Sequence, residues 1–136
     1  MFQPKKLKFR KFQSERILSN SLATKGYSLV YGKMGLKACE GKMINDKHLN
    51  ACVNELKRRL GKKGRFWLRI FPHIPKTKKP PETRMGGGKG DIEKYVTFVK
   101  AGNILFEVDG LDDASLKNAL KLTSYKLPLK TKIVSR

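Results

Sequence analysis

The chain has 136 residues, of which 31 are Lys or Arg and 11 are Asp or Glu, so its net charge is +20. Its hydrophobic content of 39% is too high for a disordered basic tail and predicts one folded domain with a modest core. No apolar run reaches the roughly 18 residues that cross a bilayer or resembles a secretory signal, and two cysteines do not make a disulfide framework. These features predict a soluble protein in a reduced compartment.

Most of the charge lies in the first two thirds of the chain. Residues 1–90 hold 23 basic and 5 acidic side chains, net +18, whereas residues 91–136 hold 8 and 6, net +2. So strong a field favours a polyanion, which could be nucleic acid, an acidic lipid surface or an acidic protein. The basic residues of the first part form three clusters: Lys5, Lys6, Lys8, Arg10 and Lys11; Lys57, Arg58, Arg59, Lys62, Lys63 and Arg65; and Lys76, Lys78, Lys79, Arg84 and Lys89.

Residues 1–26 are predicted to be a basic N-terminal arm, followed by a single domain over residues 27–136. The first cluster is interleaved with Phe2, Phe9 and Phe12 and has no helical or alternating period. Cations that neutralise phosphates, next to rings that stack on unpaired bases, suit nucleic-acid binding. The alternatives are a frayed terminus whose rings pack on the domain, and an import peptide, which Pro4 and the dense Lys/Arg/Phe pattern disfavour.

The first predicted elements of the domain are a hairpin and a helix. Residues 27–31 and 36–39 flank a glycine-containing turn at 32–35 and predict two strands. Apolar residues spaced for one helical face follow, with Asn45 or Asp46 as the cap and Gly61 as the end. Cys52 belongs to this apolar stripe and is expected to be an inert core thiol. The stripe consists of Leu49, Cys52, Val53, Leu56 and Leu60.

The remaining elements complete an α+β pattern. Strand 65–71 has an apolar face and a mixed aromatic and cationic face with Trp67 and Arg69; we expect Trp67 in the core, with a stacking platform as the alternative. Strands at 95–100 and 104–108, a helix at 113–124 that begins at an acidic pair, and a strand at 129–134 follow. This order predicts a two-layer α+β sandwich, with two helices on one face of a mostly antiparallel sheet.

Residues 72–91 are predicted to be a long, protruding Gly/Pro loop. So long an irregular connection in a compact domain is either functional or disordered. Four prolines stiffen its approach, and its glycines let the backbone pass close to another surface, where N–H groups and cations meet phosphates together. A flexible basic loop without a function is the alternative. The predicted tip consists of Arg84, Met85, Gly86, Gly87, Gly88, Lys89 and Gly90.

The sequence contains no complete motif for an enzyme or a metal site. Gly90 follows Lys89 where a phosphate-binding loop needs Ser or Thr, and the dinucleotide fingerprint fails as well. His48 and His73 have no metal-ligand spacing with each other or with the cysteines, and no catalytic triad or carboxylate pair stands out. We therefore expect no enzymatic activity, no metal and no cofactor.

Seven segments follow one another in order, with suitable spacing, over nearly the whole chain. They are residues 2–5, 8–11, 35–38, 64–72, 79–80, 84–90 and 126–131. With these segments the chain resembles the L-sixteen family of large-subunit ribosomal proteins, of the bacterial and organellar type. The resemblance implies an α+β domain bound to rRNA of the large ribosomal subunit, near the aminoacyl-tRNA site, with tRNA and neighbouring ribosomal proteins as further partners. Catalysis in that region belongs to RNA, so the protein would position and stabilise.

The clusters and the resemblance together give the expected site. The loop Arg84 to Gly90 is expected to lie close to tRNA and the peptidyl transferase region. The expected RNA-binding residues are Lys5, Lys6, Lys8, Phe9, Arg10, Lys11, Lys57, Arg58, Arg59, Lys62, Lys63, Arg69, Lys76, Lys78 and Lys79.

Two features bear on location and one rival function remains. Residues 13–21 lack the Gly- and Arg-rich stretch that relatives usually carry after the arm, and Lys outnumbers Arg by 23 to 8, a bias that AT-rich coding produces. We expect a mitochondrial ribosome, with a bacterial cytoplasm or a plastid as the alternative. The rival is a nonspecific, nucleoid-type nucleic-acid-binding protein, which shares the charge but has no use for a stiff, glycine-tipped loop.

Overall fold

The computed structural model describes residues 2–13 and 21–136. None of the helices in these residues is long and apolar enough to span a membrane. The elements along the chain are β1 (Met34–Ala38), β2 (Lys42–Asn45), α1 (Asp46–Leu60), β3 (Arg65–Leu68), β4 (Ile74–Lys78), β5 (Asp91–Val99), β6 (Ile104–Asp109), α2 (Asp113–Ser124) and β7 (Thr131–Ser135).

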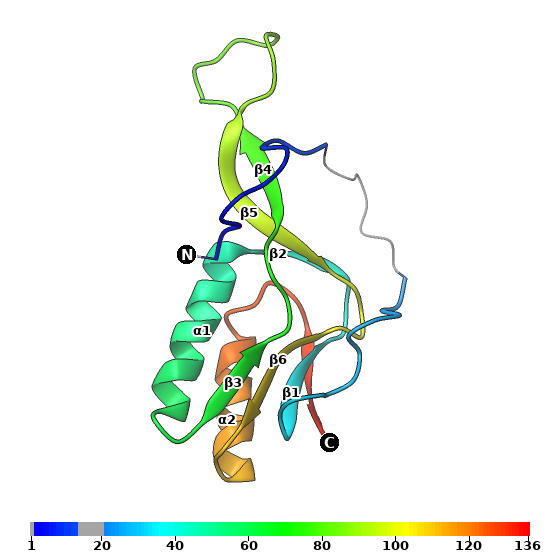
Figure 1. The fold of residues 1–136 in the computed structure, drawn as a ribbon, viewed down its shortest axis with the longest axis vertical. Helices are drawn as coiled ribbons and strands as arrows, with labels where there is room; N and C mark the ends of the chain where they lie inside the picture. Colours follow the sequence, from blue (N-terminus) through cyan, green and yellow to red (C-terminus); the bar gives the residue numbers. More distant parts are fainter. Residues whose placement is uncertain (1, 14–20) are drawn as a thin grey trace.

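The strands form two antiparallel sheets. One has four strands in the order β3-β6-β1-β7, and the other has three in the order β2-β5-β4. Helices α1 and α2 pack on each other, on the same side of the four-stranded sheet (Figure 1). The predicted α+β class with two layers is confirmed. The expectation of one sheet is wrong, because the turn at residues 100–103 passes the chain from β5 in one sheet to β6 in the other.

The core lies between the two helices and the four-stranded sheet. The predicted stripe of α1 is buried along its whole length, and five of the six residues of β6 are buried. Phe66, Leu68 and Ile70 pack against this core from β3 and the residues after it, as their alternation predicts. Cys52 is fully buried, which confirms its expected core position, and this burial raises the pKa of its thiol to about 12.

Several expected boundaries differ from the structure. Residues 27–31 form no strand, and the strand of that region is β1. The four residues of β2 were not predicted, and the strand at 65–71 ends at Leu68. The predicted loop 72–91 contains β4, because an edge strand tolerates Pro75, which has no N–H to donate. The irregular segment is therefore residues 79–90, and β5 begins directly after it, at Asp91 rather than at residue 95.

Candidate nucleic-acid interface

The predicted basic clusters occupy two ends of an elongated molecule. The strands β4 and β5 form a ribbon that projects from the body and carries the glycine loop, residues 79–90, at its end (Figure 1). The N-terminal arm runs beside this ribbon, whereas the C-terminal end of α1 lies toward the opposite end of the long axis (Figure 1). The structure thus brings the first and third clusters together and leaves the second apart.

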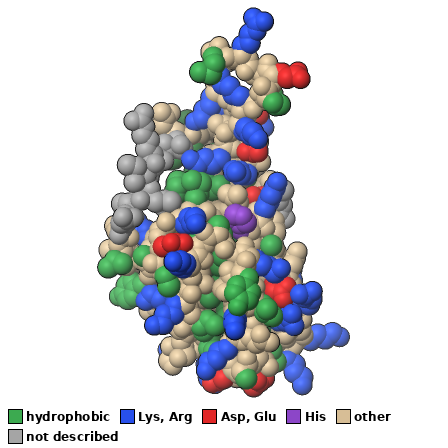
Figure 2. All heavy atoms as spheres, turned by 180° about the vertical axis from the view of Figure 1, so that it is seen from behind, with side chains coloured by type: hydrophobic (Ala, Val, Ile, Leu, Met, Phe, Trp, Pro, Cys, Tyr) green, Lys and Arg blue, Asp and Glu red, His purple; other side chains and the backbone are tan. Residues whose placement is uncertain are grey.

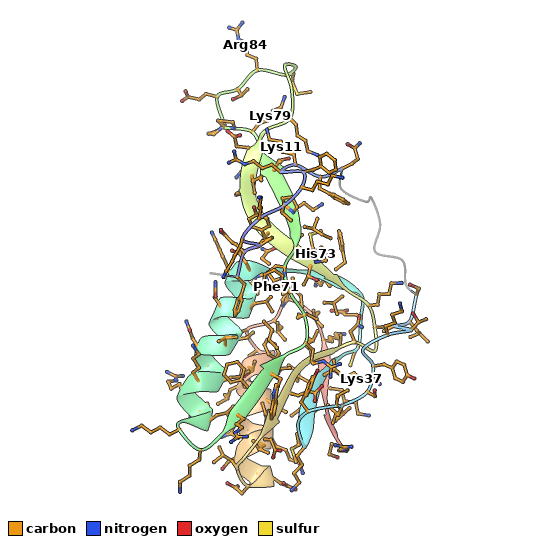
Figure 3. The ribbon with its side chains drawn as sticks, viewed as in Figure 1. Lys11, Lys37, Phe71, His73, Lys79 and Arg84 are labelled. Atoms are coloured by element: carbon orange, nitrogen blue, oxygen red, sulfur yellow. The ribbon has the colours of Figure 1, made fainter. Side chains whose placement is uncertain are left out.

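The arm and the base of the loop are joined by reciprocal hydrogen bonds, which we call the arm–loop clasp. Lys11 Nζ donates to the backbone oxygen of Lys89 at 2.9 Å, and Lys89 Nζ donates to the backbone oxygen of Phe12. Lys11 Nζ also lies 3.7 Å from Asp91 at the start of β5. Figure 3 shows Lys11 at the neck of the loop, where the arm crosses the ribbon. The clasp holds the arm and the loop in one relative position.

The loop tip depends on glycine. Gly86, Gly87 and Gly88 have φ values of 108°, 65° and 84°, which side chains rarely adopt. Lys79 Nζ donates to the backbone oxygen of Gly86 at 2.8 Å and so closes the loop across its width. Arg84 points away from the body at the far end of the loop (Figure 3). The end of the loop therefore exposes the Arg84 guanidinium and a stretch of glycine backbone.

The three phenylalanines of the arm have different surroundings. Phe2 packs against the hydrophobic core, as the alternative for the arm predicts. Phe9 and Phe12 instead keep 73% and 47% of their surface exposed. The start of the arm is therefore anchored on the body by Phe2. Phe9 and Phe12 are exposed, and they are next to lysines and Arg10 in the sequence.

The second cluster surrounds an acid that the sequence analysis did not single out. Lys57, Arg58 and Arg59 lie in the last turn of α1, where positive charge interacts favourably with the helix end. Arg58 and Arg59 donate to the Glu55 carboxylate at 2.8 and 3.0 Å, and Lys126 Nζ lies 3.7 Å from it. The hydrogen bonds from Arg58 and then Arg59 lower the pKa of this carboxyl despite some burial. All six residues of this cluster, including Arg58 and Arg59, are exposed.

Arg69, expected to bind RNA, has an internal partner. Its guanidinium donates to the buried carboxylate of Glu107 and lies 5.2 Å from the ring centre of Tyr31, and its side chain is 19% exposed. Glu107 also accepts backbone N–H groups from Val30 at 3.1 Å, Tyr31 at 2.7 Å and Gly32 at 2.9 Å. These bonds hold residues 30–32 over the sheet. The sequence signal for this buried pairing was the position of Glu107 between the apolar residues Phe106 and Val108 of β6.

Trp67 lies on the side of β3 that faces away from the core, where Tyr31 also lies. Its ring is stacked on Tyr31, with centroids 6.1 Å apart and an angle of 21° between the planes. Trp67 is half-buried and outside the hydrophobic core, so the expected core position is wrong. The reason is the strand alternation, which gives the core side of β3 to Phe66 and Leu68.

The ribbon carries further cations on its surface. Lys76 Nζ lies 5.8 Å from the ring centre of Phe98, and Lys78 Nζ lies 3.7 Å from Glu93. Figure 2 shows Lys and Arg side chains along the ribbon and loop with few acidic ones between them. In residues 2–13 and 21–136, no group of three or more His, Cys, Asp or Glu side chains could hold a metal ion. The site therefore offers cations, exposed rings and backbone N–H groups.

A family model described as "Ribosomal protein L16p/L10e" matches residues 4–134. The chain belongs to this family. It is similar to the large ribosomal subunit proteins uL16 of Rhodopseudomonas palustris (strain HaA2), 45% identical, Afipia carboxidovorans, 46% identical, and Nitrobacter winogradskyi, 45% identical. Each match covers 100% of this chain and 98% of the relative. The family consists of ribosomal proteins, which are structural components and not enzymes, and these relatives are bacterial.

A first prediction concerns the clasp. Replacing Lys89 with Met removes its bond to the Phe12 carbonyl, and a bond of this kind contributes about 1 kcal/mol. We expect chymotrypsin to cleave after Phe9 and Phe12 about fivefold faster than in the unmodified protein, because the arm opens more often. Lys62→Met, which removes one charge at the far end of α1, is the matched control. Equal cleavage rates in the two variants would contradict the clasp.

A second prediction concerns Glu107. Burial raises the pKa of this carboxyl, but the N–H groups of residues 30–32 and the Arg69 guanidinium together lower it by more. A lowered folded pKa stabilises the protein above the unfolded value of about 4.3, and this contribution is lost as the pH falls through the folded value. We expect Glu107→Gln to reduce the free energy of unfolding near neutral pH by about 3 kcal/mol and to flatten its fall at acid pH.

Urea unfolding followed from neutral to acid pH measures both effects. Glu93→Gln is the control, since Glu93 makes only an exposed pair with Lys78. The role given to Glu107 fails if both variants show the same stability and the same dependence on pH.

Proposed function

We propose that this chain is a structural constituent of the large ribosomal subunit and that it binds rRNA through its cationic projections. The observation that carries the proposal is the family match over residues 4–134, since the chain covers nearly the full length of relatives named as large-subunit proteins. The net charge of +20 fits a polyanionic environment that offsets the repulsion among the chain's own cations. Neighbouring ribosomal proteins are its further partners.

The contacts with rRNA come from three places on the rigid body. The arm contributes its lysines, Arg10 and Phe9, the end of α1 contributes Lys57 to Lys63, and the ribbon contributes Lys76, Lys78 and Lys79. Phosphate contacts fix position without reading sequence, so recognition rests on RNA shape and unpaired bases. Arg69 has the weakest support in this set, because its guanidinium is engaged with Glu107.

The glycine loop positions tRNA at the aminoacyl site near the peptidyl transferase centre. Three features support this role: the loop stands at the end of the ribbon, Arg84 points away from the body, and Gly86 to Gly88, whose positive φ values require glycine, expose a backbone without side chains (Figure 3). Such a tip approaches RNA closely, where backbone N–H groups and the guanidinium meet phosphates. The clasp keeps the loop from swinging relative to the arm.

Salt dependence tests the two ends separately. Each neutralised phosphate contributes about 0.7 to 0.9 to the slope of log affinity against log salt, so removing three contacting lysines should flatten the slope by about 2 to 3. We expect this for Lys5, Lys6 and Lys8 changed together to Ala, and for Lys57, Lys62 and Lys63 changed together. The measurement is titration of the full chain with an rRNA fragment.

The control triple carries Lys117, Lys121 and Lys132 changed to Ala, three exposed lysines of the weakly charged last third. Its slope should stay that of the unmodified chain. A slope that falls equally for all three triples supports the rival, a nonspecific nucleic-acid-binding protein. Sedimentation separates the two functions. A ribosomal protein sediments in stoichiometric amounts with large subunits, whereas the rival coats duplex DNA.

We further propose that the ribosome concerned is mitochondrial, with a bacterial cytoplasm or a plastid as the alternative. The excess of Lys over Arg, 23 to 8, and the divergent segment 13–21 support this location, although most of that segment lies outside the described residues. Fractionation of the source cells with an antibody to the chain tests it. We expect the signal in large subunits released from purified mitochondria; recovery from the cytoplasmic ribosomes instead overturns the location and leaves the ribosomal role intact.

A further inference from the structure

An open groove separates the arm from the ribbon. Figure 3 shows the arm passing beside the start of β4, where His73 is labelled. The groove has a volume of about 320 Å³, at the lower end of the range for small-ligand sites. It is lined by Leu7, Phe9 and Phe12 from the arm and by His73, Ile74 and Pro75 from the ribbon side.

The rings in this groove are left in water. Phe9 and Phe12 are 73% and 47% exposed, and Leu7 beside them is 36% exposed. A contiguous exposed patch of large apolar side chains marks a binding surface, in contrast with single apolar side chains scattered over a surface. The groove therefore has the composition of a site that a planar apolar group would fill.

Both walls of the groove are held in place. The arm is anchored at its start by Phe2 on the core and at its end by the clasp of Lys11 and Lys89. The opposite wall belongs to β4, where Pro75 is buried. Preorganised walls reduce the ordering that a ligand must impose on binding.

The charge around the groove is positive. Lys8 Nζ lies 5.5 Å from the ring centre of Phe9, and Lys11 Nζ sits at the adjoining clasp, 3.7 Å from Asp91, which does not line the groove. Among the described residues that line the groove, none is acidic. Rings on which bases stack, next to cations that follow a phosphate backbone, are the combination with which proteins hold unpaired nucleotides.

We propose that this groove holds an unpaired nucleobase of rRNA, stacked on Phe9 and Phe12, with its flanking phosphates at Lys8 and Lys11. The inference rests on the proposed function and adds to it a base-binding site on the arm. His73 and Pro75 close the site from the other side. A stacking site accepts any base, because every base has a π face, so this groove selects single strands over duplexes and not one sequence over another.

The test uses the full chain and two RNA probes. One probe is a single-stranded oligoribonucleotide with one 2-aminopurine, a base whose fluorescence falls when it stacks; the other is a blunt duplex. The variant carries Phe9→Leu and Phe12→Leu, which keep apolar side chains but remove the rings. Tyr125→Leu is the control, since this ring is 70% exposed on the body and lies outside the groove.

We expect the double variant to bind the single strand about tenfold more weakly and to lose the quenching of 2-aminopurine. Its affinity for the duplex and its slope of log affinity against log salt should stay unchanged, because stacking releases no counterions. Lys8→Met, which leaves the clasp intact, should show the opposite pattern, a slope flatter by about 0.7 with quenching retained. Thermal unfolding should be the same for the double variant and the unmodified chain, since neither ring belongs to the core.

Other outcomes overturn the proposal. If the double variant binds and quenches like the Tyr125→Leu control, the groove holds no base. If it binds RNA normally but its large subunits lack a neighbouring ribosomal protein, the groove holds a protein segment. A chain that sediments with large subunits yet never quenches the probe refutes the groove alone, whereas a chain that does not sediment with them refutes the proposed function.

Discussion

The buried carboxylate of Glu107 is the interaction on which the body of this protein depends. A charge with no exposed surface is tolerated only when its oxygens are fully paired, and three backbone N–H groups with Arg69 supply that pairing. The three N–H groups belong to residues 30–32, which have no strand pairing of their own. One side chain thus fixes the segment that leads into β1 on the face of the sheet opposite the helices, and it brings Tyr31 onto Trp67.

The other structural acids follow the same logic. Glu55 gathers Arg58, Arg59 and Lys126 between the two helices, and Asp112 caps α2 by accepting the N–H of Ser115. In a chain with 31 cations and 11 acids, these carboxylates are placed where they join elements. On the projections Asp91 and Glu93 lie 3.7 Å from Lys11 and Lys78, but the cations there outnumber the acids, so the remaining repulsion is offset best by an external polyanion. Several cations of the body are therefore neutralised by buried carboxylates of the chain itself, whereas most cations of the described projections are not.

The sequence predicted what local patterns determine. The apolar stripe of α1 with Asn45 as its cap, and α2 behind Asp112, lie where the spacing placed them. Partition of the strands into two sheets could not be predicted, because β5 pairs with β2 and β4 through contacts that no local period encodes. The strand β4 could not be predicted for the same reason. Its proline indicates a loop unless it is known that the strand lies at the edge of its sheet. In the candidate site, the clusters were visible, but their pairing through the clasp depends on residues 78 positions apart.

Counting cations also left open which of them remain available to a partner. Arg58 and Arg59 face a carboxylate, which cancels part of their field. Lys79 and Lys89 instead donate to backbone carbonyls, which carry no net charge. An ammonium held by a neutral acceptor is fixed in position yet keeps its full charge, and only part of its donor capacity is used. The loop is therefore shaped by lysines that keep their full charge, so ordering the projection does not reduce the positive charge that it presents.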